Sequence, residues 1–180
     1  MDLFPELART LREHEAELIR YAARMLGDQD NARDAVQDTF IKYAKFKGAN
    51  PKAVISNVRA WLYKSARNIC IDMLRKKKRG AEILLSEEIE LMPSQEDCQP
   101  DNMMRKSEET LMLRKLINKL SPKDREIIIL KIEHGNSYKE IAEITGLSVT
   151  NVGFILHNAM MKLKDEFHKN SNPCGQGTEK

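Results

Sequence analysis

The chain of 180 residues is poor in the residues that build disulfide frameworks, metal centres and nucleophilic active sites. Its three cysteines, Cys70, Cys98 and Cys174, are far apart and odd in number, so they support neither a disulfide framework nor a zinc site. The four histidines are equally scattered, and no glycine-rich phosphate-binding loop is present. We therefore expect no metal, no cofactor and no enzymatic activity.

Long apolar segments are also missing. No stretch approaches the roughly 18 residues that indicate a membrane-spanning helix, and no signal peptide stands out. With 41% hydrophobic and 32% charged residues, the composition is typical of a soluble protein with modest cores. We expect a cytoplasmic protein without membrane insertion.

Strand patterns and internal repeats are absent as well, whereas nearly every patterned segment has the periodicity of a helix. The sequence therefore predicts an all-α fold with two small helical domains, residues 1–80 and residues 103–169. Residues 81–102 are acidic, contain two prolines and are interpreted as a flexible linker. Residues 170–180 are interpreted as a disordered tail.

Local signals set the helix boundaries of the first domain. The second helix is expected to bury Ala32, Val36, Thr39, Phe40 and Tyr43. A loop over residues 50–56 separates it from a long third helix, which Ser56 or Asn57 caps and which Gly80 is expected to end.

The third helix has two faces of different character. Its apolar stripe consists of Leu62, Ala66, Ile69 and Met73. Its polar face consists of Lys64, Asn68, Asp72, Arg75 and Arg79. The five consecutive cations at residues 75–79 either form a solvated helix end that suits the helix dipole, or bind a polyanion beside amides that can read bases.

Charge is distributed unevenly around this helix, although the net charge of the chain is only +3. Residues 58–79 hold eight Lys or Arg and one acid, whereas residues 80–101 hold seven acids and no Lys or Arg. Such a change of sign between neighbouring segments indicates that the two segments have different electrostatic roles.

The C-terminal part of the chain has the spacing of a helix-turn-helix. Ser137 and Glu140 form a capping box, Gly146 lies at the turn, and Ser148 caps a longer helix. That helix is expected to bury a stripe formed by Val149, Val152, Leu156, Ala159 and Leu163. An ordinary helical hairpin is the alternative, but Ala142 and Gly146 allow close helix approach and favour DNA-binding geometry.

The outward face of this helix is unusual for DNA recognition. It is expected to present Asn151, Phe154, Ile155 and Asn158, with Thr150 and His157 on its flank. Residues 148–159 contain no Lys or Arg, whereas recognition helices typically combine base-reading groups with cations. Phe154 and Ile155 are equally suited to contact thymine methyls or to form a protein-binding patch.

Three segments of the chain occur in an order that is typical of one family. They are DNARDAVQDTFIKYAK, then VRAWLYKSARNICIDMLRKKKR, and finally INKLSPKDREIIILKIEHGNSYKEIAEITGLSVTNVGFILHNAMMKL. Together they resemble a group IV bacterial sigma factor, the extracytoplasmic-function (ECF) class of the sigma-70 family. The first two segments resemble the halves of sigma region two, and the third resembles region four, which also has counterparts in response regulators.

The resemblance implies a promoter-specificity subunit that directs transcription initiation, with core RNA polymerase and promoter DNA as partners. Family members are commonly held inactive by an anti-sigma factor, so such a partner is expected too. The acidic linker resembles the connector that threads the RNA path of the polymerase, and a plain solvated tether is the alternative.

The functional roles of the family fall on three groups of residues. Docking on core polymerase is implied for Asp34, Gln37, Asp38 and Ile41. Binding of the minus-ten DNA is implied for Asn50, Asn57, Lys64, Arg67, Asn68, Arg75, Lys76, Lys77, Lys78 and Arg79. Binding of the minus-thirty-five element is implied for Ser137, Lys139, Thr150, Asn151, Phe154, His157, Asn158 and Lys162. Trp61 is either a stacking platform for a base or a core anchor.

Two other functions fit parts of the sequence. A stand-alone helix-turn-helix regulator would bind operators without polymerase, but its recognition helix would have to do so without cations. A protein-interaction adaptor would use the patch of Phe154 and Ile155 to bind a partner.

Overall fold

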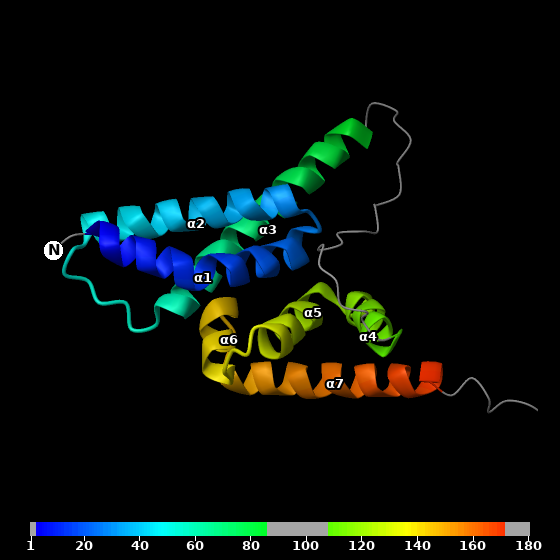
Figure 1. The fold of residues 1–180 in the computed structure, drawn as a ribbon. Helices are drawn as coiled ribbons and strands as arrows, with labels where there is room; N and C mark the ends of the chain where they lie inside the picture. Colours follow the sequence, from blue (N-terminus) through cyan, green and yellow to red (C-terminus); the bar gives the residue numbers. More distant parts are fainter. Residues whose placement is uncertain (1–2, 86–107, 172–180) are drawn as a thin grey trace, which may run out of the picture. The chain divides into compact units, whose positions relative to one another are not determined.

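The computed structural model describes residues 3–85 and 108–171, and the chain divides into two compact units, Met1–Pro100 and Asp101–Lys180. Every regular element in these described ranges is a helix, which confirms the all-α prediction (Figure 1). The first unit contains α1 (Leu3–Leu26), α2 (Gln29–Ala49) and α3 (Val58–Leu85). The second contains α4 (Glu108–Lys119), α5 (Pro122–Ile128), a π-helical turn (Ile129–Glu133), α6 (Tyr138–Thr145) and α7 (Val149–Ser171).

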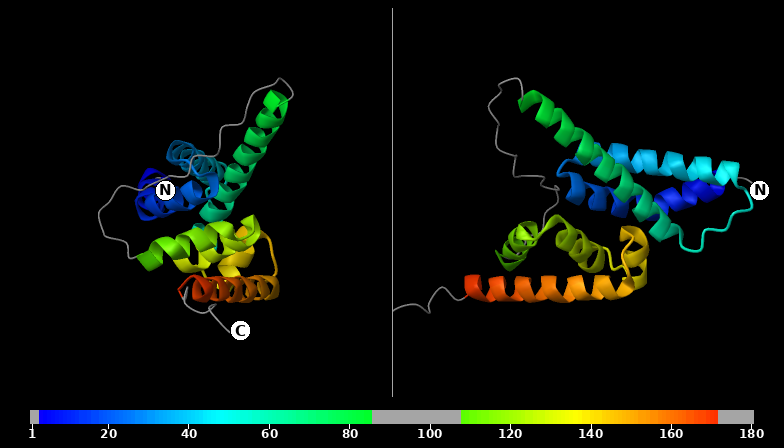
Figure 2. Two further views of the ribbon diagram at one scale, coloured as in Figure 1. Left: turned by 90° about the vertical axis from the view of Figure 1, so that its right-hand side faces the viewer. Right: turned by 180° about the vertical axis from the view of Figure 1, so that it is seen from behind.

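In the first unit, α1 and α2 lie side by side and α3 packs against both (Figures 1 and 2). Gly27 makes the turn between α1 and α2 with a φ of 72°, a conformation that favours glycine. Asp28 then caps α2, because its carboxylate accepts the backbone N–H of Asp30 at 3.1 Å. The five residues of α2 that were expected to be inward are all buried. They pack with Leu18, Tyr21 and Ala22 of α1 and with Leu62, Tyr63 and Ala66 of α3.

The expected end of α3 at Gly80 is wrong, because the helix continues to Leu85. Glycine within an exposed helix costs only about 1 kcal/mol relative to alanine, and Gly80 alone therefore does not terminate it. Residues 81–85, which were assigned to the linker, belong to this helix. The remaining linker residues 86–102 lie outside the described residues, as do residues 103–107 and 172–180.

The second unit is built on helix starts that the sequence predicted. Ser121 caps α5 by accepting the backbone N–H of Asp124 at 3.2 Å. The capping box at α6 is formed in both directions, since Ser137 accepts from the Glu140 backbone and the Glu140 carboxylate accepts from the Ser137 backbone. Ser148 caps α7 by accepting the Asn151 N–H at 3.2 Å. Gly146 lies between α6 and α7 with a φ of 75°, which completes the helix-turn-helix.

The π-helical turn after α5 was not predicted from the sequence. Asn136, three residues after its end, bonds back to it: the side chain and the backbone N–H of Asn136 both donate to the carbonyl of Leu130, at 3.1 and 3.0 Å. Asn136 is fully buried in the core of this unit. These two hydrogen bonds satisfy the buried amide of Asn136, which would be costly inside the unit without a partner.

Two expectations for α7 are wrong. Ile155 was placed on the outward face, but only 8% of it is exposed, because it lies at the edge of the stripe formed by Val152, Leu156 and Ala159. Val149 was placed in that stripe, but 44% of it is exposed. As the first residue of the helix, Val149 falls on the side of Gly153, beyond the margin of the stripe.

Replacing Gly153 by alanine is expected to stabilise the second unit by about 1 kcal/mol. A Cβ atom there would meet only Cε2 of Tyr138, at 3.8 Å, which is an ordinary van der Waals contact. Thermal unfolding followed by circular dichroism measures the change. Gly146→Ala is the matched control and should destabilise the protein, because its φ of 75° strains any other residue. A loss of stability in Gly153→Ala would contradict this account of the helix.

Candidate nucleic-acid interface

The predicted polymerase-docking residues share one exposed face of α2. Asp34, Gln37, Asp38 and Ile41 fall at positions i, i+3, i+4 and i+7, and all four are exposed. Ile41 keeps 44% of its surface accessible beside two carboxylates. An apolar side chain within a charged face is the composition that a protein partner can bind.

A surface groove between α1 and α2 adjoins this face. Gln37 and Ile41 line it from α2, together with the core residue Phe40. Leu7 and Leu11 line it from α1. The sequence did not indicate this contribution of α1, because only the pairing of two helices brings these side chains together.

The loop before α3 is fixed at both ends by the amides that were predicted to read bases. The Asn50 side chain donates to the carbonyl of Phe46 at 3.1 Å, at the end of α2. The Asn57 side chain accepts the backbone N–H of Ala60 at 2.9 Å and caps α3. Between them, Val54 has 93% of its surface exposed. The two asparagines therefore position the loop, and the residues between them form its accessible part.

The outward face of α3 carries the predicted cations. Lys64 and Asn68 are exposed, Arg67 is half-buried, and every residue from 74 to 79 is exposed. Two acids of α3 flank the run in the sequence. Asp72 precedes it, and its carboxylate lies 3.6 Å from Arg75 Nη1 in an exposed pair, which contributes little. Glu82 follows Arg79 by three residues, so five cations stand against two acids. The run of cations therefore keeps a strong positive field that is open to a polyanion.

The first turn of α3 is fixed to α1 by a half-buried cluster of charges. Glu17 of α1 accepts two hydrogen bonds from Arg59, at 3.2 and 3.1 Å, and its Oε1 lies 2.9 Å from His14 Nδ1. Burial alone would raise the pKa of Glu17, but the bonds from Arg59 and His14 outweigh it and hold this pKa below its ordinary value. Arg59, one of the eight cations of residues 58–79, thus stabilises the packing of α3 on α1.

Trp61 belongs to an aromatic cluster between α2 and α3. Its ring lies 5.6 Å from that of Tyr43 and 5.7 Å from that of Phe46, measured between centroids. Trp61 is half-buried, and these distances are typical of aromatic pairs in protein cores. This packing favours the core anchor over the stacking platform.

The predicted minus-thirty-five residues, Lys162 excepted, lie on the first half of α7 and at the start of α6. Thr150, Phe154 and His157 are exposed on its outer side, and Asn151 and Asn158 lie half-buried along one edge. Ser137 and Lys139 are exposed at the start of α6. Tyr138 lies against Gly153 of α7, and Lys131 Nζ stands 5.2 Å from the centre of the Tyr138 ring.

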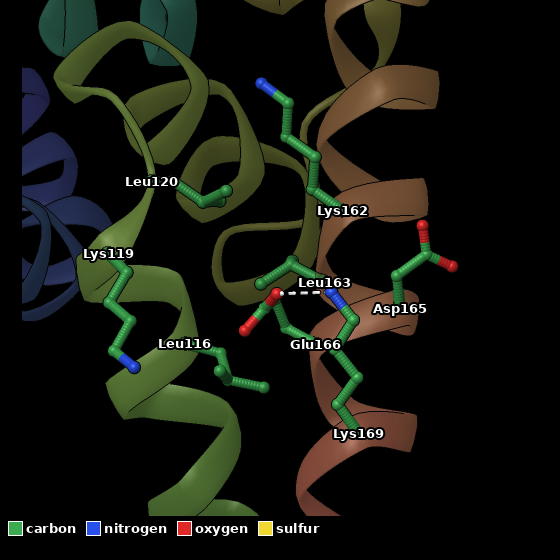
Figure 3. Close-up of a pocket in the computed structure, with 8 residues that line it drawn as sticks. All are labelled: Leu116, Lys119, Leu120, Lys162, Leu163, Asp165, Glu166 and Lys169. Atoms are coloured by element: carbon green, nitrogen blue, oxygen red, sulfur yellow. Dashed lines mark hydrogen bonds and ion pairs between the residues drawn. The ribbon is translucent and has the colours of Figure 1, made fainter.

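Lys162 is placed apart from this group. It follows Phe154 by eight residues, or roughly 12 Å along the helix. Its Nζ lies 3.5 Å from the carboxylate of Asp124 in α5. Figure 3 shows Lys162 beside a pocket between α4 and α7, above Leu116 and Leu163 and near the ion pair of Lys169 with Glu166. The structure thus associates Lys162 with the packing of α4, α5 and α7.

The described residues contain neither a candidate metal centre nor a candidate membrane span. Within the described ranges, no group of three or more His, Cys, Asp or Glu residues could hold a metal ion. No helix in those ranges is both long and apolar enough to cross a bilayer. Of the three cysteines, only Cys70 falls in the described residues, where it is buried and is not part of a disulfide.

Taken together, a three-helix unit with a strongly cationic helix and a second unit with a helix-turn-helix define a protein of the DNA-binding transcription factor class. The Sigma-70 region 2 family matches residues 10–80, and the Sigma-70, region 4 family matches residues 110–163. The chain is 30% identical to RNA polymerase sigma factor YlaC of Bacillus subtilis (strain 168), covering 88% of this chain and 90% of YlaC.

Two further relatives agree with these matches. The chain is 27% identical to ECF RNA polymerase sigma factor SigE of Mycolicibacterium smegmatis, over 96% of this chain and 65% of SigE. The sigma factor RpoE from Bartonella quintana, crystallised with the anti-sigma factor NepR, superposes with a TM-score of 0.66 at 29% identity, covering 91% of this chain and 95% of RpoE. The chain belongs to the sigma-70 family of RNA polymerase sigma factors, in its ECF group. It is a factor for promoter-specific transcription initiation.

Proposed function

We propose that the protein directs promoter-specific initiation by binding core RNA polymerase and both promoter elements, and that it catalyses no reaction itself. The observation that carries this proposal is the separation of two DNA-binding features onto two compact units. One is the exposed cationic face of α3, and the other is the capped helix-turn-helix of α6 and α7. A factor of this kind acts in the cytoplasm, where the polymerase works.

The first unit, proposed as residues 1–80, binds the polymerase and the minus-ten element. The face of Asp34, Gln37, Asp38 and Ile41 is exposed and adjoins an apolar groove, which supports its assignment to core polymerase. The loop before α3 and the polar face of α3 are assigned to the minus-ten strand. Flipping a base out of the duplex costs a few kcal/mol, and contacts along this helix have to offset that cost.

The second unit, proposed as residues 103–169, binds the minus-thirty-five element. Its recognition helix carries no Lys or Arg between residues 148 and 159, so the backbone amides at its capped N-terminus and the polar groups of Thr150 and Asn151 supply contacts there. Residues 81–102 are proposed as a flexible acidic linker between the two units.

An anti-sigma factor is proposed as a further partner. The support is the similar sigma factor RpoE, which was solved in complex with the anti-sigma factor NepR. The exposed face of α2 and its groove offer apolar and charged groups that such a partner can use.

The deciding experiment is transcription in vitro with core RNA polymerase and the full-length protein. Core polymerase with the full-length protein is first used to select promoters from DNA with randomised minus-ten and minus-thirty-five elements. Specific initiation from the selected promoters, dependent on the added protein, is expected. A chain that neither binds core polymerase nor supports specific initiation would rule out the proposal. Duplex binding by the chain without polymerase, at equal affinity and specificity, would support the stand-alone regulator instead.

A further inference from the structure

Phe154 is an aromatic side chain that the fold does not use. It keeps 66% of its surface exposed, whereas its neighbour Ile155 is buried. In the helical phase of α7 it lies nearly opposite the stripe of Val152, Leu156 and Ala159, and therefore at the middle of the outward face. This apolar surface is therefore available for a contact outside the free chain, and burying it there would be favourable.

The surroundings of Phe154 are neutral. Residues 148–159 contain no Lys, Arg, Asp or Glu, and His157 is the one titratable side chain among them. Guanine is most often read by the bidentate donors of Arg or Lys, and this surface offers none. Asparagine suits adenine, and an apolar side chain suits the methyl group of thymine. Asn151 and Asn158 lie along one edge beside Phe154, so the outward face matches A·T base pairs.

A cation at the margin of this surface favours DNA as the occupant. Lys139 is exposed at the start of α6, the helix that precedes α7. It stands outside the neutral patch, where it can meet a phosphate while the patch meets base edges. The capped N-terminus of α7 adds backbone amides at the same end.

We propose that Phe154 reads the C5-methyl group of a thymine in the minus-thirty-five element, and that this contact makes the helix-turn-helix selective for A·T pairs. The inference rests on the proposed function and deepens it, because it names the base chemistry that this recognition helix takes. Burying one methyl group against the ring corresponds to roughly a fourfold change in affinity.

The test removes that methyl group from the DNA. Each thymine of the minus-thirty-five element in a selected promoter is replaced in turn by deoxyuridine, and the affinity of the holoenzyme for each DNA is measured at one fixed salt concentration. For the unaltered protein, the replacement at one position should weaken binding roughly fourfold. Phe154→Ala should weaken binding to the thymine promoter by a similar factor and should no longer respond to deoxyuridine at that position. Phe154→Leu should keep part of the response.

Met160→Ala is the matched control, since Met160 is an apolar residue on the same helix with 49% of its surface exposed, on a different side of the helix. It should retain the full response to deoxyuridine. Equal losses for Phe154→Ala on thymine and deoxyuridine DNA would overturn the inference, and so would promoter binding that Phe154→Ala leaves intact. The latter result, with loss of a protein complex, would instead mark Phe154 as a docking residue. Failure of the proposed function is a different result, in which the unaltered holoenzyme selects no promoter.

Discussion

Replacing Lys76, Lys77 and Lys78 together by alanine is expected to weaken promoter binding by the holoenzyme on all sequences alike and to flatten its salt dependence. These cations are exposed on α3, and each phosphate that a cation neutralises releases counterions from DNA. The slope of log affinity against log salt should fall by about 2 to 3 if all three bind phosphates, at about 0.9 per contact. Filter binding or anisotropy across a salt series measures the slope.

A charge-matched triple variant controls for the change in net charge. Arg12 and Arg20 of α1 and Lys115 of α4 are exposed and belong to none of the predicted DNA-binding groups, so their replacement by alanine should change the slope much less. Asn68→Ala is the contrasting variant, because an amide reads a base edge and carries no charge. It should change which minus-ten base is preferred while the slope stays the same. If Asn68→Ala and the lysine variant behave alike, the division between backbone binding and base reading is wrong.

Replacing Glu17 by alanine is expected to destabilise the first unit by about 2 kcal/mol. Glu17 and Arg59 keep only 21% and 26% of their side-chain surfaces exposed, and the variant leaves the guanidinium of Arg59 without its bidentate acceptor. Trp61 is the single tryptophan of the chain and lies in the first unit, so its fluorescence during urea unfolding follows this unit. Glu13→Ala, which removes an exposed pair with Arg9, should leave the midpoint nearly unchanged.

The same carboxylate predicts a dependence on pH. The pKa of Glu17 is lower in the folded protein than in the unfolded chain, so its contribution is complete above the ordinary value near 4.5. That contribution is lost as the pH falls through the lowered folded value. The difference in stability between the unaltered protein and Glu17→Ala should therefore be constant near neutral pH and should shrink in acid. A difference that stays constant down to strongly acidic pH would contradict the assignment.

Helix starts were predictable because their signals are local. Ser121, Ser137 and Ser148 each accept a backbone N–H within the first turn of the helix that they begin, and the sequence alone shows such residues. Helix ends were less predictable. Gly80 was taken as a stop, yet glycine stops a helix only where the chain turns into the left-handed conformation, as at Gly27 and Gly146.

Side-chain environments that depend on distant partners were the part that the sequence could not supply. Periodicity assigned Val152, Leu156, Ala159 and Leu163 correctly, but it could not resolve the margins of the stripe, where Ile155 is covered. The pairing of Glu17 with Arg59 joins residues 42 positions apart, and no local pattern indicates it. Which exposed residues contact DNA is equally invisible to a local pattern, and the variants of Lys76, Lys77, Lys78, Asn68 and Phe154 test those roles.

The continuation of α3 to Leu85 has a consequence for the cations at residues 75–79. They precede the last turn of the helix, so the helix dipole, which acts within that turn, does little to stabilise them. Arg75 and Arg79, the one pair of cations at positions i and i+4 within residues 75–79, instead repel each other at a cost of a few tenths of a kcal/mol. The free helix therefore holds a small electrostatic strain there, and a bound polyanion relieves it. Part of the binding free energy then comes from strengthening the helix itself.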